Sequence, residues 1–88
     1  MTKDMIFAKI KLLIKNRLKM TTEPNVNFNL FNEGNHFDSL TLLEFILELE
    51  DEFSIIIADE DLVPENFESI KKIGNYIFEL YKADGQVI

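Results

Sequence analysis

Apolar residues recur at intervals of three and four in three stretches of the chain, the spacing that places them on one face of an α-helix. The first stretch runs from about Lys3 to Lys19, with lysines and one arginine between the apolar positions. The second runs from Ser39 to Phe53, and the third runs from an N-cap at Ser69 to Gly85. The pattern therefore predicts three main helices.

A long loop joins the first two predicted helices. The segment Thr21–Asp38 contains a proline, a glycine and five asparagines, all residues that favour turns. Its isolated apolar residues predict a loop pinned to the core rather than a disordered linker; they are Val26, Phe28, Leu30 and Phe31. Loops of this length in a compact domain are uncommon and are often functional.

The connection between the second and third predicted helices contains shorter elements. Ser54–Ala58 is a β-branched run that predicts an extended connector packed on the core, and Asp59 is placed to cap a turn. Pro64 suits the first position of another short helical turn. The expected fold is therefore all-α, a small four-helix bundle in a single domain over residues 1–88. It has three main helices and one short helix, which comes third in order along the chain.

The helix predicted at Ser39–Phe53 carries two apolar groups, because its side chains turn by about 100° per residue. The larger group is Leu42, Phe45, Ile46, Leu49 and Phe53. The smaller group, centred roughly 140° away, is Leu40, Leu43 and Leu47, flanked by Glu44, Glu50 and Asp51.

Two interpretations of the smaller group remain open from the residues alone. Both faces are buried if the helix is sandwiched between others, as happens in small bundles. Alternatively, the leucines form an exposed patch rimmed by carboxylates, which is the composition of a protein docking surface.

Composition narrows the classes of function. The 88 residues include no cysteine, which excludes a disulfide framework, a thiolate nucleophile and a cysteine zinc site. The net charge of -7 is uneven, since Met1–Met20 carries six basic residues and one acid. The acidic remainder disfavours nucleic acid and favours partners with basic patches.

The basic first stretch bears on location. Its lysines interrupt the apolar run too often for a signal peptide or a membrane span, so no membrane partner is expected. Because the absence of cysteine gives no sign of an oxidising compartment, the cytoplasm is the expected location. The lysines are interpreted as the solvated face of a packed helix, with an anionic membrane face as the alternative. Nothing in the sequence requires more than a monomer.

No self-contained catalytic apparatus is visible, so a non-enzyme without a catalytic residue or metal site is expected. His36 lies too close in sequence to Ser39 to form a hydrolase triad with it. The cluster Asp59–Asp61 lacks the glycine and distal glutamate of a calcium loop, and no glycine-rich phosphate cradle is present.

Asp38 and Ser39 are the remaining candidates, at the start of the second predicted helix. The simplest role for them is a helix cap. The position also suits a phosphodiester on the Ser39 hydroxyl, because the negative phosphate would lie against the free N–H groups and the positive end of the helix dipole. An external enzyme would have to activate the hydroxyl.

From about Leu30 to Ile77 the chain resembles the acyl and peptidyl carrier proteins. These four-helix domains are modified by 4′-phosphopantetheine on the serine of an Asp-Ser-Leu motif that begins their second helix. The similar segments, in order, are Leu30–Gly34, Phe37–Leu40, the acidic helix through Phe53, and Pro64–Ile70.

The resemblance implies specific roles. Ser39 would carry the 4′-phosphopantetheine group, a flexible arm derived from coenzyme A. Asp38 would assist the phosphopantetheinyl transferase, near the magnesium ion of that enzyme. Contacts with partner enzymes would come from Leu40, Leu43, Glu44, Leu47 and Asp51. Further partners would be a loading enzyme, either an adenylation enzyme or an acyltransferase, and downstream biosynthetic enzymes.

The resulting hypothesis is a stand-alone carrier that shuttles acyl or aminoacyl thioesters. An aminoacyl, peptidyl or secondary-metabolism carrier is favoured, because Pro64–Ile70 resembles that type and the first helix is more basic than in carriers of fatty-acid synthesis. A fatty-acid carrier is the first alternative. An unmodified helical interaction module, with Ser39 as a simple cap, is the alternative of another class, and a small hydrolase using Ser39 ranks last.

Overall fold

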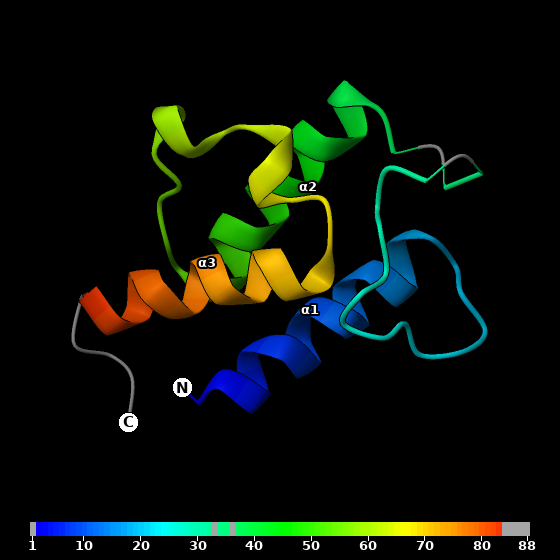
Figure 1. Cartoon of the computed structure of the whole chain (residues 1–88), viewed down its shortest axis with the longest axis horizontal. Coiled ribbons are helices and arrows are strands. Elements are labelled where there is room, and N and C mark those ends of the chain that lie inside the picture. Colours follow the sequence, from blue (N-terminus) through cyan, green and yellow to red (C-terminus); the bar gives the residue numbers. More distant parts are fainter. Residues whose placement is uncertain (1, 33, 36, 84–88) are drawn as a thin grey trace.

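A computed structural model describes residues 2–32, 34–35 and 37–83, which fold into three helices and two short 3₁₀ turns (Figure 1). The helices are α1 (Lys3–Arg17), α2 (Ser39–Phe53) and α3 (Ile70–Ala83). The turns are η1 (Asp59–Asp61) and η2 (Pro64–Asn66). Within the described ranges, β-pairing is limited to one bridge between Asn29 and Ser69, so the all-helical prediction is confirmed.

The helix boundaries follow the predicted ones closely, with one difference. α1 ends two residues before Lys19, because Lys19 adopts a left-handed conformation with φ of 54°. The Met20 N–H then donates to the Lys15 carbonyl at 2.9 Å, which closes the end of the helix. Ser69 caps α3 as predicted, since its hydroxyl accepts from the Lys72 N–H at 3.2 Å. The predicted terminator Gly85 lies outside the described residues.

The segment between α2 and α3 is less helical than expected. The short third helix is only the 3₁₀ turn η2, which begins at Pro64 as predicted. The prediction that Asp59 caps a turn is wrong, because Asp59 is the first residue of η1 and forms no capping bond. The polar contact here comes from Asp61, which accepts a 2.8 Å hydrogen bond from the Tyr76 hydroxyl. Burial and this bond raise the pKa of Tyr76 to about 12.

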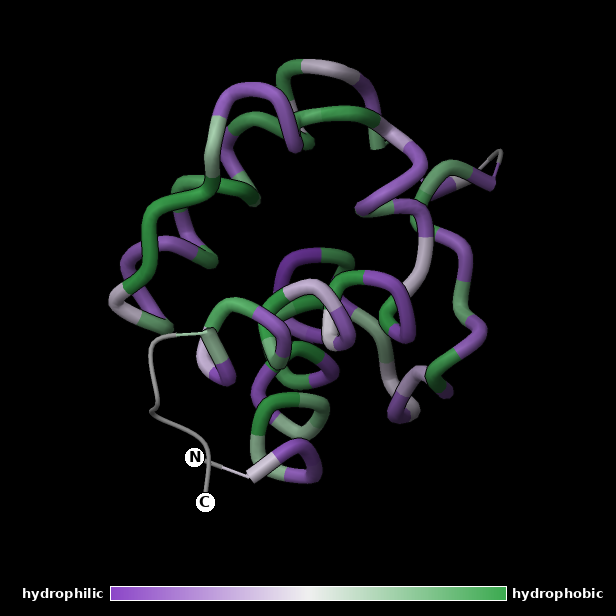
Figure 2. The backbone as a smooth tube through the Cα atoms, turned by 60° about the vertical axis from the view of Figure 1, so that its left-hand side comes forward, coloured by the Kyte–Doolittle hydropathy of each residue, from purple (hydrophilic) through white to green (hydrophobic). Residues whose placement is uncertain are grey.

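The core is built from one face of each helix together with residues from the connecting segments. Figure 2 shows hydrophobic and hydrophilic positions alternating around the helical turns, as expected for helices with one buried face. Phe67, Leu30 and Ile57 join the core from outside the helices. The buried side chains of the hydrophobic core are Ile6, Ile10, Ile14, Leu30, Phe37, Phe45, Ile46, Leu49, Phe53, Ile57, Phe67, Ile70, Ile73, Ile77 and Tyr81.

The long loop before α2 is fastened to the start of α3, which confirms that it is pinned. The Leu30 N–H donates to the Glu68 carbonyl at 2.8 Å, and the Lys71 N–H donates to the Val26 carbonyl at 2.8 Å. Asparagine side chains stabilise its turns; for example, Asn29 Oδ1 accepts from the Phe31 N–H at 2.8 Å. The loop therefore delivers the chain to α2 along a defined path.

α1 and α3 pack against each other (Figure 1). Gly74 is buried in α3, and a Cβ atom placed there would lie 2.7 Å from Cζ of Phe7. The close approach of the two helices thus depends on the missing side chain.

We expect Gly74→Ala to lower the free energy of unfolding by about 1–3 kcal/mol, the usual cost of overpacking. Helix propensity alone predicts the opposite, a gain of about 1 kcal/mol. Urea denaturation followed by circular dichroism measures the change. Adding Phe7→Leu should recover part of the loss; a more stable Gly74→Ala protein would mean that the ring moves aside freely.

Over the part of the chain that the structure describes, no helix combines the length and apolar character needed to cross a bilayer.

Candidate attachment site at the start of α2

Asp38 is the N-cap of α2. Its Oδ1 accepts a hydrogen bond from the Thr41 N–H at 2.8 Å, with the extended backbone typical of a cap. This N–H, with a further contribution from the Thr41 hydroxyl, lowers the pKa of the Asp38 carboxyl below its ordinary value. The carboxylate is therefore charged throughout the neutral range.

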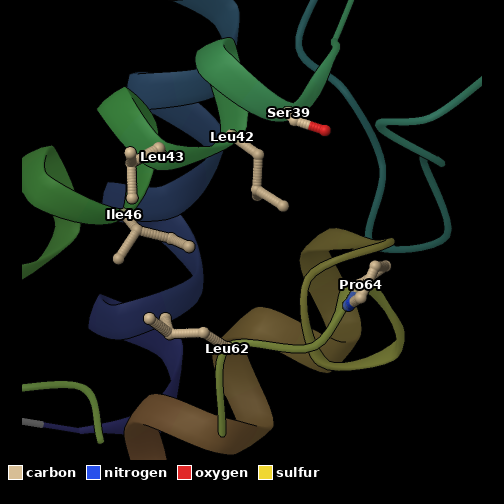
Figure 3. Close-up of a pocket in the computed structure, with 6 residues that line it drawn as sticks. All are labelled: Ser39, Leu42, Leu43, Ile46, Leu62 and Pro64. Atoms are coloured by element: carbon tan, nitrogen blue, oxygen red, sulfur yellow. The ribbon is translucent and has the colours of Figure 1, made fainter. Parts of the chain in front are cut away.

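Ser39 is the first residue of α2 and is exposed. The capping role that the interaction-module hypothesis gave to Ser39 is wrong, because the Asp38 side chain performs it. The Ser39 hydroxyl points outward from the first turn (Figure 3), at the positive end of the helix dipole. It is thus available for chemistry.

Aromatic packing fixes the position of this turn. Phe37 is buried immediately before the cap and lies edge-on to Phe45 of α2, with ring centroids 5.7 Å apart. It also meets Phe31 of the loop edge-on at 6.1 Å. Such contacts between aromatic edges and faces are favourable. His36 lies outside the described residues.

An open hollow of about 280 Å³ lies beside Ser39. Figure 3 shows Leu42 projecting into it from α2, while Leu62 and Pro64 face it from the segment that follows η1. Leu43 and Ile46 complete the lining. The hydroxyl therefore stands at the rim of a largely apolar recess.

The smaller apolar group of α2 is exposed, which decides between the two interpretations left open by the sequence. Leu40, Leu43 and Leu47 are 66%, 51% and 60% exposed. The larger group faces the core, where Leu42 is half-buried and the other members are buried. Glu44 and Asp51 are also exposed, so the leucines lie beside carboxylates on an open face.

Three ion pairs between α1 and α2 were not predicted from the sequence. Arg17 lies 3.8 Å from Glu44 and 3.6 Å from Glu48, measured between guanidinium nitrogens and carboxylate oxygens. Lys9 pairs with Glu52 at 3.0 Å. The partners are separated by 27 or more residues in the chain, so helical spacing carried no signal for them.

The described residues contain no group of three His, Cys, Asp or Glu side chains placed to hold a metal ion.

Comparison with known proteins identifies the family of this chain. Residues 8–77 match the family model described as "Phosphopantetheine attachment site". An acyl carrier protein of Onion yellows phytoplasma is 37% identical over 73 residues, covering 83% of this chain and 93% of the relative. The chain is a member of the acyl carrier protein family. Another acyl carrier protein, from Lactobacillus acidophilus, is 35% identical over 97% of this chain and 100% of the relative.

The matched family model indicates that this carrier holds 4′-phosphopantetheine as a covalently attached prosthetic group. The relatives carry the name acyl carrier protein, which favours the acyl type over the aminoacyl or peptidyl type that the sequence alone favoured. No solved structure matches the chain with significance.

The residues at the start of α2 fit the group. A phosphodiester needs an accessible oxygen and an environment that tolerates negative charge, and the Ser39 hydroxyl at the positive helix end supplies both. The apolar recess beside it leaves room next to the hydroxyl. When bound, the group supplies a flexible arm whose terminal thiol carries acyl groups.

Proposed function

We propose that Ser39 is the attachment residue of this carrier. The observation that carries the proposal is that Asp38, and not Ser39, caps α2, which leaves the Ser39 hydroxyl exposed at the positive helix end. In the attachment reaction, the Ser39 oxygen forms a bond to the phosphorus of the phosphopantetheine part of coenzyme A. The bond to adenosine 3′,5′-bisphosphate breaks, and the hydroxyl proton leaves.

Asp38 assists this reaction in the proposal. Its carboxylate is adjacent to Ser39, is charged at neutral pH and keeps one oxygen on the Thr41 N–H. The second oxygen faces a docked transferase and its magnesium ion, for which a carboxylate is a suitable ligand. The same side chain thereby begins the helix and helps to place the metal of the partner.

The exposed face of α2 is the proposed docking surface for the phosphopantetheinyl transferase. We define the docking face as Leu40, Leu43, Glu44, Leu47 and Asp51. Carboxylates around a small apolar patch speed the encounter with a basic partner, while the limited apolar area keeps the complex short-lived. A carrier that visits several enzymes needs such brief contacts.

The proposed cargo is an acyl group, supplied by an acyltransferase or another loading enzyme and passed to downstream biosynthetic enzymes. The names of the relatives support this class. The whole chain acts as a single, stand-alone carrier domain and is not itself an enzyme. The arm raises the effective concentration of its cargo at each partner site, because cargo and carrier are covalently linked.

The mass of the bound cargo tests the proposal that this carrier holds acyl groups. We expect the protein, isolated from its own cells after a rapid acid quench, to show mass increments of acyl groups above the phosphopantetheine form. Hydroxylamine should remove these increments, since it cleaves thioesters, and should leave the arm in place. Increments that match amino acids would instead restore the aminoacyl carrier hypothesis.

A further inference from the structure

Arg17 joins the end of α1 to the proposed docking face. Its Nη1 lies 3.8 Å from Glu44 Oε1, and its Nη2 lies 3.6 Å from Glu48 Oε2. The guanidinium also lies 5.8 Å from the centre of the Phe45 ring. Its side chain is 24% exposed, whereas the Glu44 side chain is 58% exposed. A largely covered guanidinium thus pairs with a carboxylate that is mostly exposed to solvent.

The acidic residues of α2 differ in what they contact. Glu52 pairs with Lys9 at 3.0 Å, and Glu50 accepts a 2.8 Å hydrogen bond from the Ile57 N–H. Glu44 and Glu48 share Arg17. Among the described residues, Asp51 forms no ion pair. The docking face therefore carries less uncompensated charge than its sequence indicates.

We propose that Arg17 is a specificity-determining residue that competes with the basic groups of partner enzymes for Glu44. The inference deepens the proposed function and rests on it, because it assumes that partners dock on this face of α2. A partner cation pairs fully with Glu44 only after it displaces Arg17. Partners with weakly basic sites are discriminated against for this reason.

The geometry suits a contact that is broken and remade. Both Arg17 distances exceed the usual length of a charge-assisted hydrogen bond, so the guanidinium is shared between two carboxylates without a close bond to either. Glu48 is the less exposed partner and can keep Arg17 when Glu44 turns to a partner enzyme. Displacement from Glu44 alone does not leave the guanidinium without a counter-ion.

The size of the effect follows from the exposure of the pair. Giving up an exposed ion pair changes an equilibrium or an encounter rate by about 1.4-fold to five-fold. The competition weakens as salt is added, because exposed charges are screened over about 10 Å at 0.1 M. Both the size and the salt dependence are measurable.

The test is the kcat/KM of modification by a phosphopantetheinyl transferase at low ionic strength. We expect Arg17→Gln to raise kcat/KM about 1.4-fold to five-fold relative to Lys11→Gln, and the ratio to approach one in high salt. Lys11→Gln is the matched control, since it removes the same charge from α1 at a residue that forms no ion pair with the described residues. Lys9→Gln is a second control, which breaks an ion pair to Glu52, a residue that is not part of the docking face as defined.

A double-mutant cycle separates competition from a structural role. If Arg17 acts through Glu44, the gain from Arg17→Gln disappears when Glu44→Gln is also present. Equal rates for Arg17→Gln and Lys11→Gln, or a gain that persists beside Glu44→Gln, would overturn the inference. If Glu44→Gln alone does not slow modification, both the inference and the proposed docking face are overturned. Failure of the Arg17 inference is therefore distinguishable from failure of the docking face.

A second measurement uses the unaltered protein, in case Arg17→Gln does not fold. The side-chain NMR signal of Arg17 Nε should shift when an inactive transferase binds, because the guanidinium leaves Glu44. A signal that stays unchanged at saturation would mean that Arg17 remains in place, contrary to the inference.

Discussion

Replacing Ser39 with alanine should abolish the mass increase produced by co-expression with a phosphopantetheinyl transferase. The unaltered protein should gain the mass of one phosphopantetheine, because the Ser39 hydroxyl is the proposed acceptor. The loss should be complete, since the reaction has no acceptor without that oxygen. Intact-protein mass spectrometry gives the result directly.

The chain offers a matched control in Ser69, whose hydroxyl caps α3. Ser69→Ala should keep the full mass increase and lose about 1 kcal/mol of stability with its cap. Ser39→Ala should behave in the opposite way, with stability near that of the unaltered protein, because Asp38 caps α2. Modified Ser39→Ala protein would place the arm elsewhere, and a large loss of its stability would return Ser39 to a structural role.

Reversing the charge of Glu44 and Asp51 to lysine should lower the kcat/KM of modification by at least about ten-fold. Like charges brought together at an interface cost several kcal/mol, whereas the loss of one exposed ion pair costs the free protein little. The helical circular dichroism signal and the thermal midpoint should therefore change only slightly. Steady-state kinetics at two salt concentrations separate electrostatic encounter from later steps, since only the former is screened.

The control for this pair is Glu23→Lys with Glu79→Lys, which changes the net charge equally at exposed positions outside the docking face. It should lower the rate much less than the Glu44 and Asp51 reversal. Equal effects of the two double variants would mean that only net charge matters. Loss of the helical signal in the Glu44 and Asp51 variant would mean that this face stabilises the fold.

The preference for an aminoacyl or peptidyl carrier illustrates a limit of reading cargo from sequence. It rested on the basic character of the first helix and on the segment Pro64–Ile70. The structure shows that two of the basic residues, Lys9 and Arg17, pair with acids of α2. Ile70 is core and Pro64 begins a turn, so these features serve the fold. The basic residues of α1 and the segment Pro64–Ile70 therefore do not indicate which cargo is loaded.

The chain by itself determined the helices and the two faces of α2, because helical spacing is a local property that needs no knowledge of neighbours. It also determined that an Asp-Ser pair would stand at the start of that helix. For the same reason it predicted the cap of α3 at Ser69. The interaction-module hypothesis was wrong, however, in making Ser39 the cap of α2, because Asp38 is the cap.

The tertiary structure decided which features of α2 remain open. Whether Leu40, Leu43 and Leu47 are covered depends on where α1 and α3 pack, which periodicity does not specify. The hollow beside Ser39 needs Leu62 and Pro64, more than 20 residues further along the chain. The pairing of Arg17 with Glu44 likewise joins distant residues. Such contacts arise from how whole helices pack against one another, so only the folded chain defines the surroundings of Ser39.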